Sequence, residues 1–440
     1  MKISRKEAFK ELLIFSLPII FGHIGIMLVG TGDMIIAGRY SRECLAAIGL
    51  AISIANPIMM LALGLQFALS PLLAKKRGEG EEITGYFWTV MLYSLVIGVG
   101  ACGLILIASN LVPYLHYTPE LNHLIIEYLE ITSFSMIGIC LFQGVKEVFQ
   151  SLEKTIAPNL IALSSAAVNL FFAYAFVFGK FGMPQMKEVG LAWSCLMVRI
   201  FMGGGLFLLS MTFWKNSKTI RWGFIREAWS LGLPITVAIF FEVMAFCSVT
   251  LFVGKFSAEQ TAANNLALNI GSLAFMIPMS IASAVGVKVG HAFGEKNLHR
   301  IRTFSFVSLI ISIGCTGFMA SMVYLFPEVL LSLFTEDTAV LGWGKTLLFW
   351  VACFQLFDGS QVTLAGILRG LSITRASSLA IFFGYWIIGI PLGYYLGFYA
   401  GMEAQGFWIG LALSLALVAM MLAFITHRKI KALEGQGFYA

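Results

Sequence analysis

The chain has 440 residues, of which 59% are hydrophobic and only 12% are charged, and its formal net charge is +6. A soluble protein of this size carries about 25% charged residues. The mean hydropathy of +0.87 and the recurrence of apolar runs along the whole length therefore exclude a soluble protein and a soluble protein with a single anchor. The positive charge requires no nucleic-acid partner, because basic loops on the cytoplasmic side of a membrane account for it.

Twelve stretches of the chain are long and apolar enough to cross a bilayer, which takes about 20 residues as a helix. The charged start MKISRKEAFKELL leads directly into the first span and does not resemble a cleavable signal peptide. The predicted fold class is an all-α integral membrane protein. In chain order the expected spans cover 12–38, 45–74, 86–109, 122–146, 158–179, 188–213, 231–254, 262–287, 304–326, 343–368, 376–398 and 405–426.

The loops between these spans fall into two sets of very different charge. The set that includes both termini holds 21 Lys and Arg residues, and the opposite set holds five. Short cytoplasmic loops are enriched in Lys and Arg. The count therefore predicts that both termini are cytoplasmic.

The chain also resembles itself at an offset of 216 residues. Leu17-Pro18-Ile19 matches Leu233-Pro234-Ile235, residues 37–54 match residues 253–270, and Gly190 matches Gly406. An even number of spans per half gives both halves the same orientation. We expect 12 transmembrane helices in two six-helix lobes, residues 1–215 and 216–440, related by a pseudo-twofold along the membrane normal.

Three carboxylates lie inside apolar spans, where each costs roughly 2.5–3.5 kcal/mol on insertion scales. They are Asp33, Glu242 and Asp358. A wet cavity, a bound cation or a bound proton would compensate this cost. In the self-alignment, Phe142-Gln143 against Phe354-Gln355 gives an offset of 212 near the third acid. Asp33 then aligns with Val249, Glu242 with Ile26 and Asp358 with Lys146, so no acid is duplicated and each belongs to one half only.

Motifs along the whole chain resemble the multidrug and toxin extrusion (MATE) family, most closely its NorM-type branch. They are LGLPITVAIFFEVMAF (231–246), AEQTAANNLALNIGSLAFMIPMSIASAVGVKVGHAFGE (258–295), LFDGSQVTLAGILRG (356–370), YWIIGIPLGYYLG (385–397), GDMIIAGRYSRECLAAIGLA (32–51) and VNLFFAYAFVFGKFGMP (168–184). The resemblance implies a two-lobe multidrug efflux antiporter. Such a protein exports cationic amphipathic compounds by alternating access, driven by Na⁺ or H⁺.

The resemblance assigns roles to the acids. Glu242 and Asp358 match the family's cation-coupling site in the C-lobe, where they would bind Na⁺ together or share a proton, and Phe246 could present its ring to the cation. Asp33 and Asn169 match an N-lobe proton or substrate site. The alternative is that each acid is hydrogen-bonded structural polarity.

The N-lobe departs from the family's pattern at two positions. Ala173 stands where relatives often carry Asp or Asn, and Cys195 stands at the position of a family Thr. In the C-lobe, Phe354 stands where some relatives carry an aromatic hydroxyl. The N-lobe is therefore poor in hard oxygen ligands, which Na⁺ prefers, so a Na⁺ site is expected in the C-lobe.

Further polar residues are weaker candidates for contact with the substrate. Glu336 and Asp337 lie at the outer entry to the tenth span, where the alternative is helix capping. Interhelical hydrogen bonds would explain the remaining candidates equally well. Those are Gln355, Gln361 and Asn265.

The seven cysteines are spread singly, without metal-ligand spacing, so no cofactor is expected beyond the coupling ion. The expected partners are cationic drug-like molecules and the lipid bilayer, with a functional monomer in a bacterial cytoplasmic (inner) membrane. Two alternatives remain. A lipid-linked precursor flippase of the same superfamily would need a basic cavity, and an intramembrane enzyme would need a catalytic motif that the chain lacks.

Overall fold

The computed structural model describes residues 3–115, 117–214, 219–335, 337–435 and 438, and not the side chain of Arg42. The described residues form helices and connecting turns, without a strand. Twelve of their helices are long and apolar enough to cross a membrane. The predicted all-α class and the predicted number of spans are confirmed.

The first six spans are α1 (Arg5–Tyr40), α2 with α3 (Arg42–Gln66, Leu69–Gly78), η1 with α4 and η2 (Ile83–Tyr86, Phe87–Leu111, Val112–Leu115), α5 (Pro119–Ser151), α6 (Ile156–Phe178) and α7 (Val189–Leu209). The last six are α9 (Trp222–Val253), α10 (Ala258–Gly294), α11 (Leu298–Leu325), α13 (Thr338–Gly370), the run α14–η3–α15–η4 (Arg375–Phe382, Phe383–Gly389, Ile390–Tyr394, Tyr395–Tyr399) and α16 (Glu403–Glu434). Two short helices, α8 (Met211–Trp214) and α12 (Pro327–Ser332), lie between spans.

The helices form two compact units. Unit 1 consists of residues 1–17, 74–80 and 237–440, and unit 2 of residues 18–73 and 81–236. The division into halves at residues 215 and 216 stays a prediction. The units depart from it, because α1 and α3 each belong partly to unit 1, and the first turns of α9 belong to unit 2.

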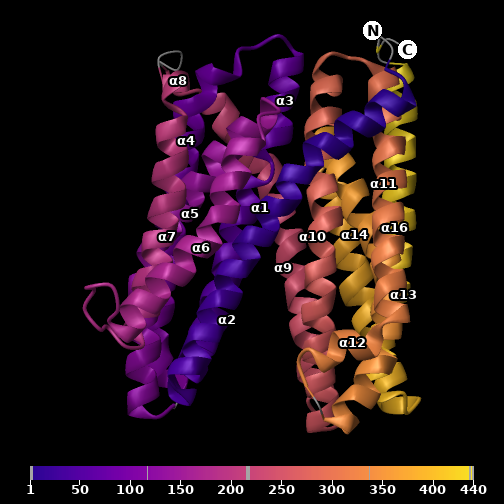
Figure 1. The fold of residues 1–440 in the computed structure, drawn as a ribbon. Helices are drawn as coiled ribbons and strands as arrows, with labels where there is room; N and C mark the ends of the chain where they lie inside the picture. Colours follow the sequence, from indigo (N-terminus) through magenta and orange to yellow (C-terminus); the bar gives the residue numbers. More distant parts are fainter. Residues whose placement is uncertain (1–2, 116, 215–218, 336, 436–437, 439–440) are drawn as a thin grey trace. The chain divides into compact units, whose positions relative to one another are not determined.

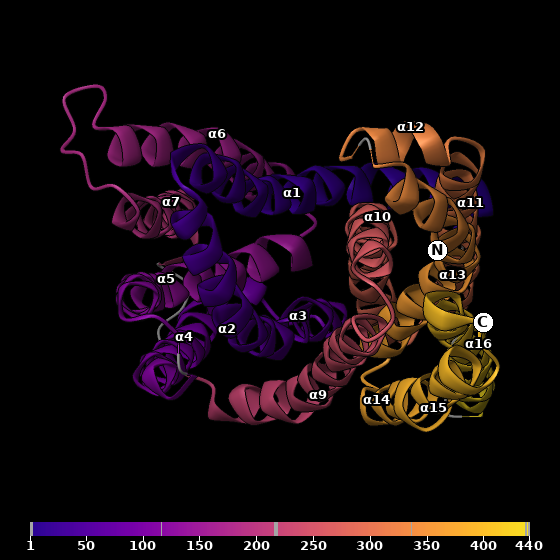
Figure 2. The same ribbon diagram turned by 90° about the horizontal axis from the view of Figure 1, so that it is seen from below.

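In unit 2 the central helix is α5, which packs against α4, α7 and α2 (Figure 2). Helices α5 and α7 cross closely where Gly138 meets Gly203, because a Cβ atom on Gly203 would lie 2.9 Å from the Gly138 carbonyl oxygen. The apolar core of this unit includes Tyr93, Phe87 and Phe142, all buried. Small residues thus let the spans approach, as is usual in membranes.

In unit 1 the central helix is α13, which lies among α10, α11 and α16 (Figure 2). A Cβ atom on Gly366 would lie 2.4 Å from the Ala282 carbonyl oxygen, and one on Gly370 would lie 2.8 Å from that of Gly286. Two glycines one turn apart therefore bring α13 against α10. This contact sets the position of Asp358, two turns earlier on α13.

The two chain ends lie at the same end of unit 1 (Figure 1). Near the N-terminus, the Ile3 carbonyl oxygen is 3.0 Å from His299 Nε2, and Arg5 stacks over the Phe306 ring. Near the C-terminus, Glu434 pairs with Arg302. All three partners lie in the first turns of α11, so Ile3 and Glu434, near the two ends of the chain, lie at the same end of this unit.

The repeat is visible in the backbone at Gly78 and Gly294, which are 216 residues apart and lie back to back in unit 1. A Cβ atom on Gly78 would lie 2.1 Å from the His291 carbonyl oxygen. One on Gly294 would lie 2.0 Å from the Lys75 carbonyl oxygen. Lys75 and His291 have the same separation in the sequence, so the contact is symmetric within the repeat.

The predicted repeat register is wrong around the tenth span. Helices α5 and α13 both have 33 residues, and their first residues, 119 and 338, are 219 apart rather than 212. Each helix is followed by a left-handed residue, Glu153 at φ 61° and Ser372 at φ 58°, again 219 apart. The counterpart of Asp358 is therefore Ile139 and not Lys146. A two-residue Phe-Gln match misled the alignment, because apolar helices of this kind offer many such matches.

Four prolines lie within spans without interrupting the helices that contain them. Pro18, Pro57, Pro234 and Pro278 lie inside continuous α-helices. The eleventh span contains π-helical segments, and Pro391 follows the first of them, η3. Single π-helical turns are frequent at functional sites, and η3 carries a residue of the candidate site described next.

Candidate functional site

Two of the three membrane acids lie together in unit 1. Glu242 comes from α9 and Asp358 from α13, and each carboxyl is within electrostatic reach of the other and of the Tyr385 hydroxyl. Tyr385, on η3, donates a hydrogen bond of 3.0 Å to Glu242 Oε1. Tyr385 is fully buried and Asp358 is only 6% exposed. Glu242 is half-buried. The result is a cluster of two acids and one hydroxyl, which we call the acid pair site.

The position of Tyr385 follows from glycines on either side of it. A Cβ atom on Gly384 would lie 2.0 Å from a Val418 methyl carbon, and one on Gly389 would lie 2.8 Å from Ser414 Oγ. Glycine at both positions lets η3 lie against α16. The neighbouring Trp386 donates its indole N–H to the Phe241 carbonyl oxygen at 2.9 Å, which ties η3 to α9 one residue before Glu242.

Aromatic rings line one side of the acid pair site. Phe246 lies one turn after Glu242 and contacts Phe354 and Tyr385 edge to face, with ring centroids 5.8 and 6.0 Å apart. Phe354 in turn contacts Trp408 at 5.7 Å. Such rings exclude water and offer negative faces to a cation.

Several polar atoms on α13 have no hydrogen-bond partner among the described residues. They are Asp358 Oδ1, both polar side-chain atoms of Gln355, Gln361 Oε1 and Thr363 Oγ1. A buried polar atom without a partner costs about 1–3 kcal/mol. Unsatisfied groups of this kind require an explanation, and a bound ion, proton or water molecule would provide one.

The donor set fits a hard monovalent cation or a proton. The pair offers carboxylate oxygens, and Gln355 and Gln361 add amide oxygens, which are the ligands that hard cations prefer. Nowhere in the described ranges do three or more His, Cys, Asp or Glu side chains form a group that could hold a metal ion. The site therefore rests on two carboxylates and neutral oxygens.

The third acid, Asp33, lies in unit 2 and has a different environment. Asn169 Nδ2 donates a hydrogen bond of 3.0 Å to Asp33 Oδ1 and lies 3.3 Å from Ser194 Oγ. The Ser194 hydroxyl donates to the Asn169 backbone carbonyl at 3.1 Å. Asp33 is 3% exposed and Asn169 is fully buried, so one acid, one amide and one hydroxyl form a compact chain across α1, α6 and α7.

Glycines on α1 bring Asp33 to Asn169. A Cβ atom on Gly25 would lie 2.5 Å from the Ala162 carbonyl oxygen, and one on Gly32 would lie 3.2 Å from Asn169 Oδ1. Small residues at this spacing allow α1 and α6 to approach closely. Arg199 on α7 lies within electrostatic reach of Asp33 and hydrogen-bonds to Ser135 Oγ at 2.6 Å.

Comparison with known proteins identifies the family. The family model described as MatE matches the chain twice, over residues 18–175 and 234–395. The chain belongs to the MATE family. The two matches begin at residues 18 and 234, which are 216 apart, the offset that the sequence repeat predicts.

Curated relatives of this MATE protein align over nearly its whole length. One is the "Multidrug resistance protein NorM" of Photobacterium profundum, 29% identical, with 95% of each chain covered. Another is the "Probable multidrug resistance protein NorM" of Bacillus subtilis, 30% identical, again with 95% of each covered. The predicted resemblance to the NorM-type branch is confirmed.

Solved structures show the same fold. The eukaryotic MATE transporter AtDTX14 matches with a TM-score of 0.86 at 19% identity, covering 98% of this chain and 99% of its own. A MATE family transporter of the MOP superfamily in an outward-facing conformation matches with a TM-score of 0.87 at 20% identity, covering 97% and 96%. MATE proteins are transporters, so this chain is a multi-pass membrane transporter and not an intramembrane enzyme.

The remaining predicted site residues of this MATE protein differ in their burial and in their distance from the acids along the chain. Gln355 and Gln361 are buried beside Asp358 on α13, whereas Asn265 is exposed on α10. Asp337 is the N-cap of α13, and its Oδ1 accepts hydrogen bonds from the Ala339 and Val340 amides at 2.8 and 3.3 Å. Capping thus accounts for Asp337, while Glu336 lies outside the described residues.

The two departures from the family's pattern in the N-lobe are both buried: Ala173 is fully buried and Cys195 is 6% exposed. Sequence reasoning missed Tyr385 and Ser194. A signal for Tyr385 existed in GYWIIGIPLG, where two glycines and a proline surround the aromatic residues. Ser194 carries no sequence signal, because a Ser in an apolar span more often bonds to its own helix.

Proposed function

We propose that the chain is a cation-coupled multidrug efflux antiporter that exports cationic amphipathic compounds by alternating access. The acid pair site carries the proposal, because the buried carboxyl of Asp358 and the half-buried one of Glu242, with unpartnered oxygens nearby, suit reversible binding of an ion. Two of the relatives are named multidrug resistance proteins, which supports the substrate class. The acidic character of the site suits a cationic cargo and opposes an anionic, pyrophosphate-linked one.

Ion binding at the acid pair site would change the balance between conformations. With no cation bound, Glu242 and Asp358 repel each other in a setting shielded from water, and one bound cation or proton relieves that repulsion. A ligand shifts a conformational equilibrium by its difference in affinity for the two states. An ion that binds this site more tightly in one conformation would therefore drive the change that releases the drug.

Asp33 and Asn169 would act as a proton or substrate group in unit 2. The amide of Asn169 holds Asp33 Oδ1 in place and leaves the second carboxyl oxygen to bind a proton or a cationic ligand. Ala173 and Cys195 provide no carboxylate or amide oxygen beside it. Na⁺ would therefore bind at the acid pair site, and Asp33 would bind a proton or the substrate.

The proposed setting is a bacterial cytoplasmic membrane with both termini in the cytoplasm and one chain as the working unit. The charge difference between the two sets of loops supports this orientation. The position of both chain ends at one end of unit 1 agrees with an even number of spans.

The test is ethidium transport in proteoliposomes under an imposed Na⁺ gradient, an imposed pH gradient, or both. Glu242→Gln and Asp358→Asn should each abolish gradient-driven transport, because each removes a negative charge from the ion site. Glu120→Gln, an exposed acid at the start of α5, is the matched control and should transport normally. Normal coupled transport by both site variants would refute the assignment. The gradient that drives transport identifies the ion.

A further inference from the structure

Asn264 on α10 is a buried amide of unit 1 that lies outside the acid pair site. Its side chain is hydrogen-bonded to two other spans. The Trp408 indole N–H of α16 donates to Asn264 Oδ1 at 3.0 Å, and Asn264 Nδ2 donates to Thr250 Oγ1 of α9 at 3.3 Å. An indole nitrogen can only donate, which fixes the orientation of the amide. Asn264 therefore joins α9, α10 and α16 at one level of unit 1.

The bond to α9 leads from Asn264 to Phe246. The Thr250 hydroxyl, which accepts from Asn264, donates to the Phe246 backbone carbonyl oxygen at 3.1 Å. Phe246 lies one turn after Glu242 and one turn before Thr250 on the same helix. Asn264 thus holds the turn of α9 that carries the first ring of the acid pair site.

The bond to α16 leads from Asn264 to the second ring, Phe354. The Trp408 ring, only 2% exposed, contacts Phe354 edge to face with centroids 5.7 Å apart. Phe354 lies one turn before Asp358 on α13 and contacts Phe246 at 5.8 Å. The two paths from Asn264 therefore meet between the rings that lie one turn from each acid. We call Phe246, Phe354 and Trp408 the aromatic wall.

A second pair of hydrogen bonds joins α10 to α16 one turn before Asn264. Gln260 Nε2 donates to Glu403 Oε2 at 2.6 Å, and the Ala404 amide donates to Gln260 Oε1 at 3.2 Å. These bonds align α10 with α16 independently of Asn264. A substitution at Asn264 therefore leaves the two helices joined and removes only the bonds that reach the aromatic wall.

The sequence repeat shows that the wall belongs to one half of the chain. The offset of 216 gives the partners of Phe246, Asn264 and Trp408, and the register of α5 and α13 gives that of Phe354. The partners carry neither an aromatic ring nor an amide. They are Gly30, Ile48, Ala192 and Ser135. The shared fold therefore does not require Asn264 or the aromatic wall.

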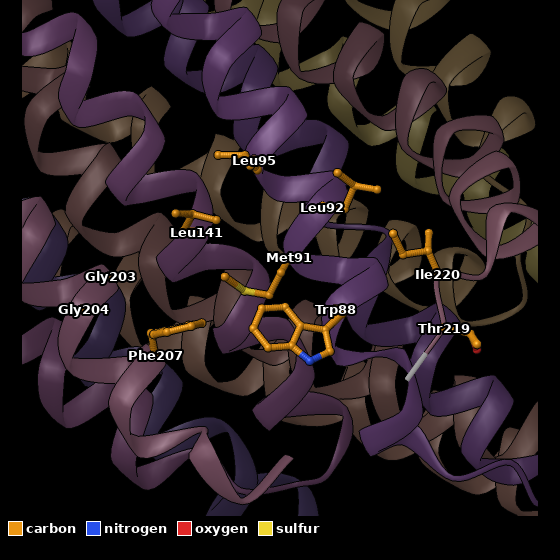
Figure 3. A pocket seen from close by; sticks show the side chains of 10 residues that line it. All are labelled: Trp88, Met91, Leu92, Leu95, Leu141, Gly203, Gly204, Phe207, Thr219 and Ile220. Atoms are coloured by element: carbon orange, nitrogen blue, oxygen red, sulfur yellow. The ribbon is translucent and has the colours of Figure 1, made fainter. Parts of the chain in front are cut away.

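Aromatic residues of unit 2 gather at a different place. Trp88 and Phe207 border an apolar crevice of about 680 Å³ between α4, α5 and α7 (Figure 3). The lining of this crevice includes neither Asp33 nor Asn169. The aromatic wall of unit 1, in contrast, lies beside the two acids, which indicates that its rings serve the acid pair site.

We propose that Asn264 is a positioning residue of the coupling site, which through Thr250 and Trp408 holds Phe246 and Phe354 against the two acids. This inference rests on the proposed function of the acid pair site. Rings beside the carboxyls keep water away, and exclusion of water strengthens the attraction between a bound ion and the acids. When Asn264 releases Trp408 and Thr250, the rings separate, water enters and the ion binds less tightly.

The first test needs no transport and measures how easily water reaches Asp358. A water-soluble carbodiimide with glycinamide converts accessible carboxyls to amides, and peptide mass spectrometry follows this reaction at Asp358 in the purified full-length protein. Asn264→Leu keeps the size of the side chain and loses both hydrogen bonds. It should raise the labelling rate about fivefold, the factor that corresponds to one lost neutral hydrogen bond.

Trp408→Phe is the second variant, because it keeps a ring and loses only the indole N–H. It should also raise the labelling rate of Asp358, and it tests the proposal if Asn264→Leu does not fold. The combined variant should label no faster than Asn264→Leu alone, because both changes break the same bond. Independent, additive effects would contradict a shared path.

Asn110→Leu is the matched control. Asn110 is exposed on α4, and its side chain bonds to the Leu106 carbonyl oxygen of its own helix, so labelling of Asp358 should not change. Equal labelling rates in Asn264→Leu, Trp408→Phe and the unchanged protein would overturn the positioning role. An equal rise at Asp33 would also overturn it, because general loosening would then explain the result.

The second test measures ethidium transport in proteoliposomes against the concentration of the driving ion, Na⁺ or H⁺. Asn264→Leu should raise the half-saturating ion concentration about fivefold and change the maximal rate by less than about twofold. A lower maximal rate with unchanged half-saturation would refute the effect on ion binding. If neither gradient drives transport by the unchanged protein, the proposed function is wrong, while the labelling rates still decide whether Asn264 positions the rings.

Discussion

The two acid sites of this transporter differ in how many of their polar atoms are hydrogen-bonded within the protein. Asp33 in unit 2 accepts a hydrogen bond from Asn169, which in turn contacts Ser194. In unit 1, Tyr385 donates to Glu242, but Asp358 Oδ1 and the polar side-chain atoms of Gln355 have no partner among the described residues. In unit 2, Asn169 Oδ1 also has no partner among the described residues, but on α13 several polar atoms are left unpaired. A site with unpaired oxygens gains free energy when a ligand pairs them, so the acid pair site is the better candidate for a coupling ion.

The two halves of the sequence repeat contribute equivalent glycines, Gly78 and Gly294, to one close helix contact. The largest effect that we expect comes from substitutions in this contact. Gly78→Ala and Gly294→Ala each place a methyl group about 2 Å from a carbonyl oxygen, and overpacking of this severity costs roughly 3 kcal/mol or more. Both variants should lower the free energy of unfolding in bicelles by similar amounts, while Gly314→Ala should leave it nearly unchanged. A large difference between the two variants would contradict the symmetric contact.

The second prediction separates the two acid sites by their response to Na⁺. If Na⁺ drives transport, Glu242→Gln and Asp358→Asn should weaken ²²Na⁺ binding by at least tenfold, roughly 1.4 kcal/mol. Asp33→Asn should bind ²²Na⁺ as the unchanged protein does, because Ala173 and Cys195 add no oxygen ligand to the Asn169 amide and the Ser194 hydroxyl in unit 2. Loss of Na⁺ binding in Asp33→Asn alone would reverse the assignment.

The third prediction concerns Tyr385, which only the structure links to the site. Tyr385→Phe removes one hydrogen bond to the Glu242 carboxylate, worth about 1 kcal/mol. It should change the apparent affinity for the coupling ion about fivefold, as measured by transport against ion concentration. Tyr395→Phe, on an exposed residue of the same span, should have no effect. Equal affinities in both variants would remove Tyr385 from the site.

The smallest expected effect is that of Ser194→Ala in unit 2. This change removes a neutral hydrogen-bond partner of Asn169, a loss of about 0.5–1.5 kcal/mol, and leaves the bond between Asn169 and Asp33 intact. We expect a slightly lower Tm and unchanged ethidium transport. A transport defect as large as that of Asp33→Asn would show that Ser194 belongs to the functional group itself.

The candidate sites were predictable from the sequence in part. Asp33 and Asn169 are 136 residues apart in the chain, and the resemblance to the MATE family paired them as the structure does. Glu242 and Asp358 were paired for the same reason. Tyr385 was not, since its role depends on a π-helical segment that turns its hydroxyl toward α9. Asp337 was predicted with two alternatives, and its hydrogen bonds to the first turn of α13 are those of a cap.

Hydropathy alone determined that this protein is membrane-embedded, all-helical and built of twelve spans, because a bilayer leaves a chain few ways to satisfy its backbone. The three acids within the spans were also evident from the sequence, because charged residues are rare in apolar segments. Only the tertiary structure decided the repeat register at α5 and α13 and the hydroxyl that reaches Glu242. Those features depend on which helix faces meet, and in spans that are apolar on every side, the residue pattern does not specify the face.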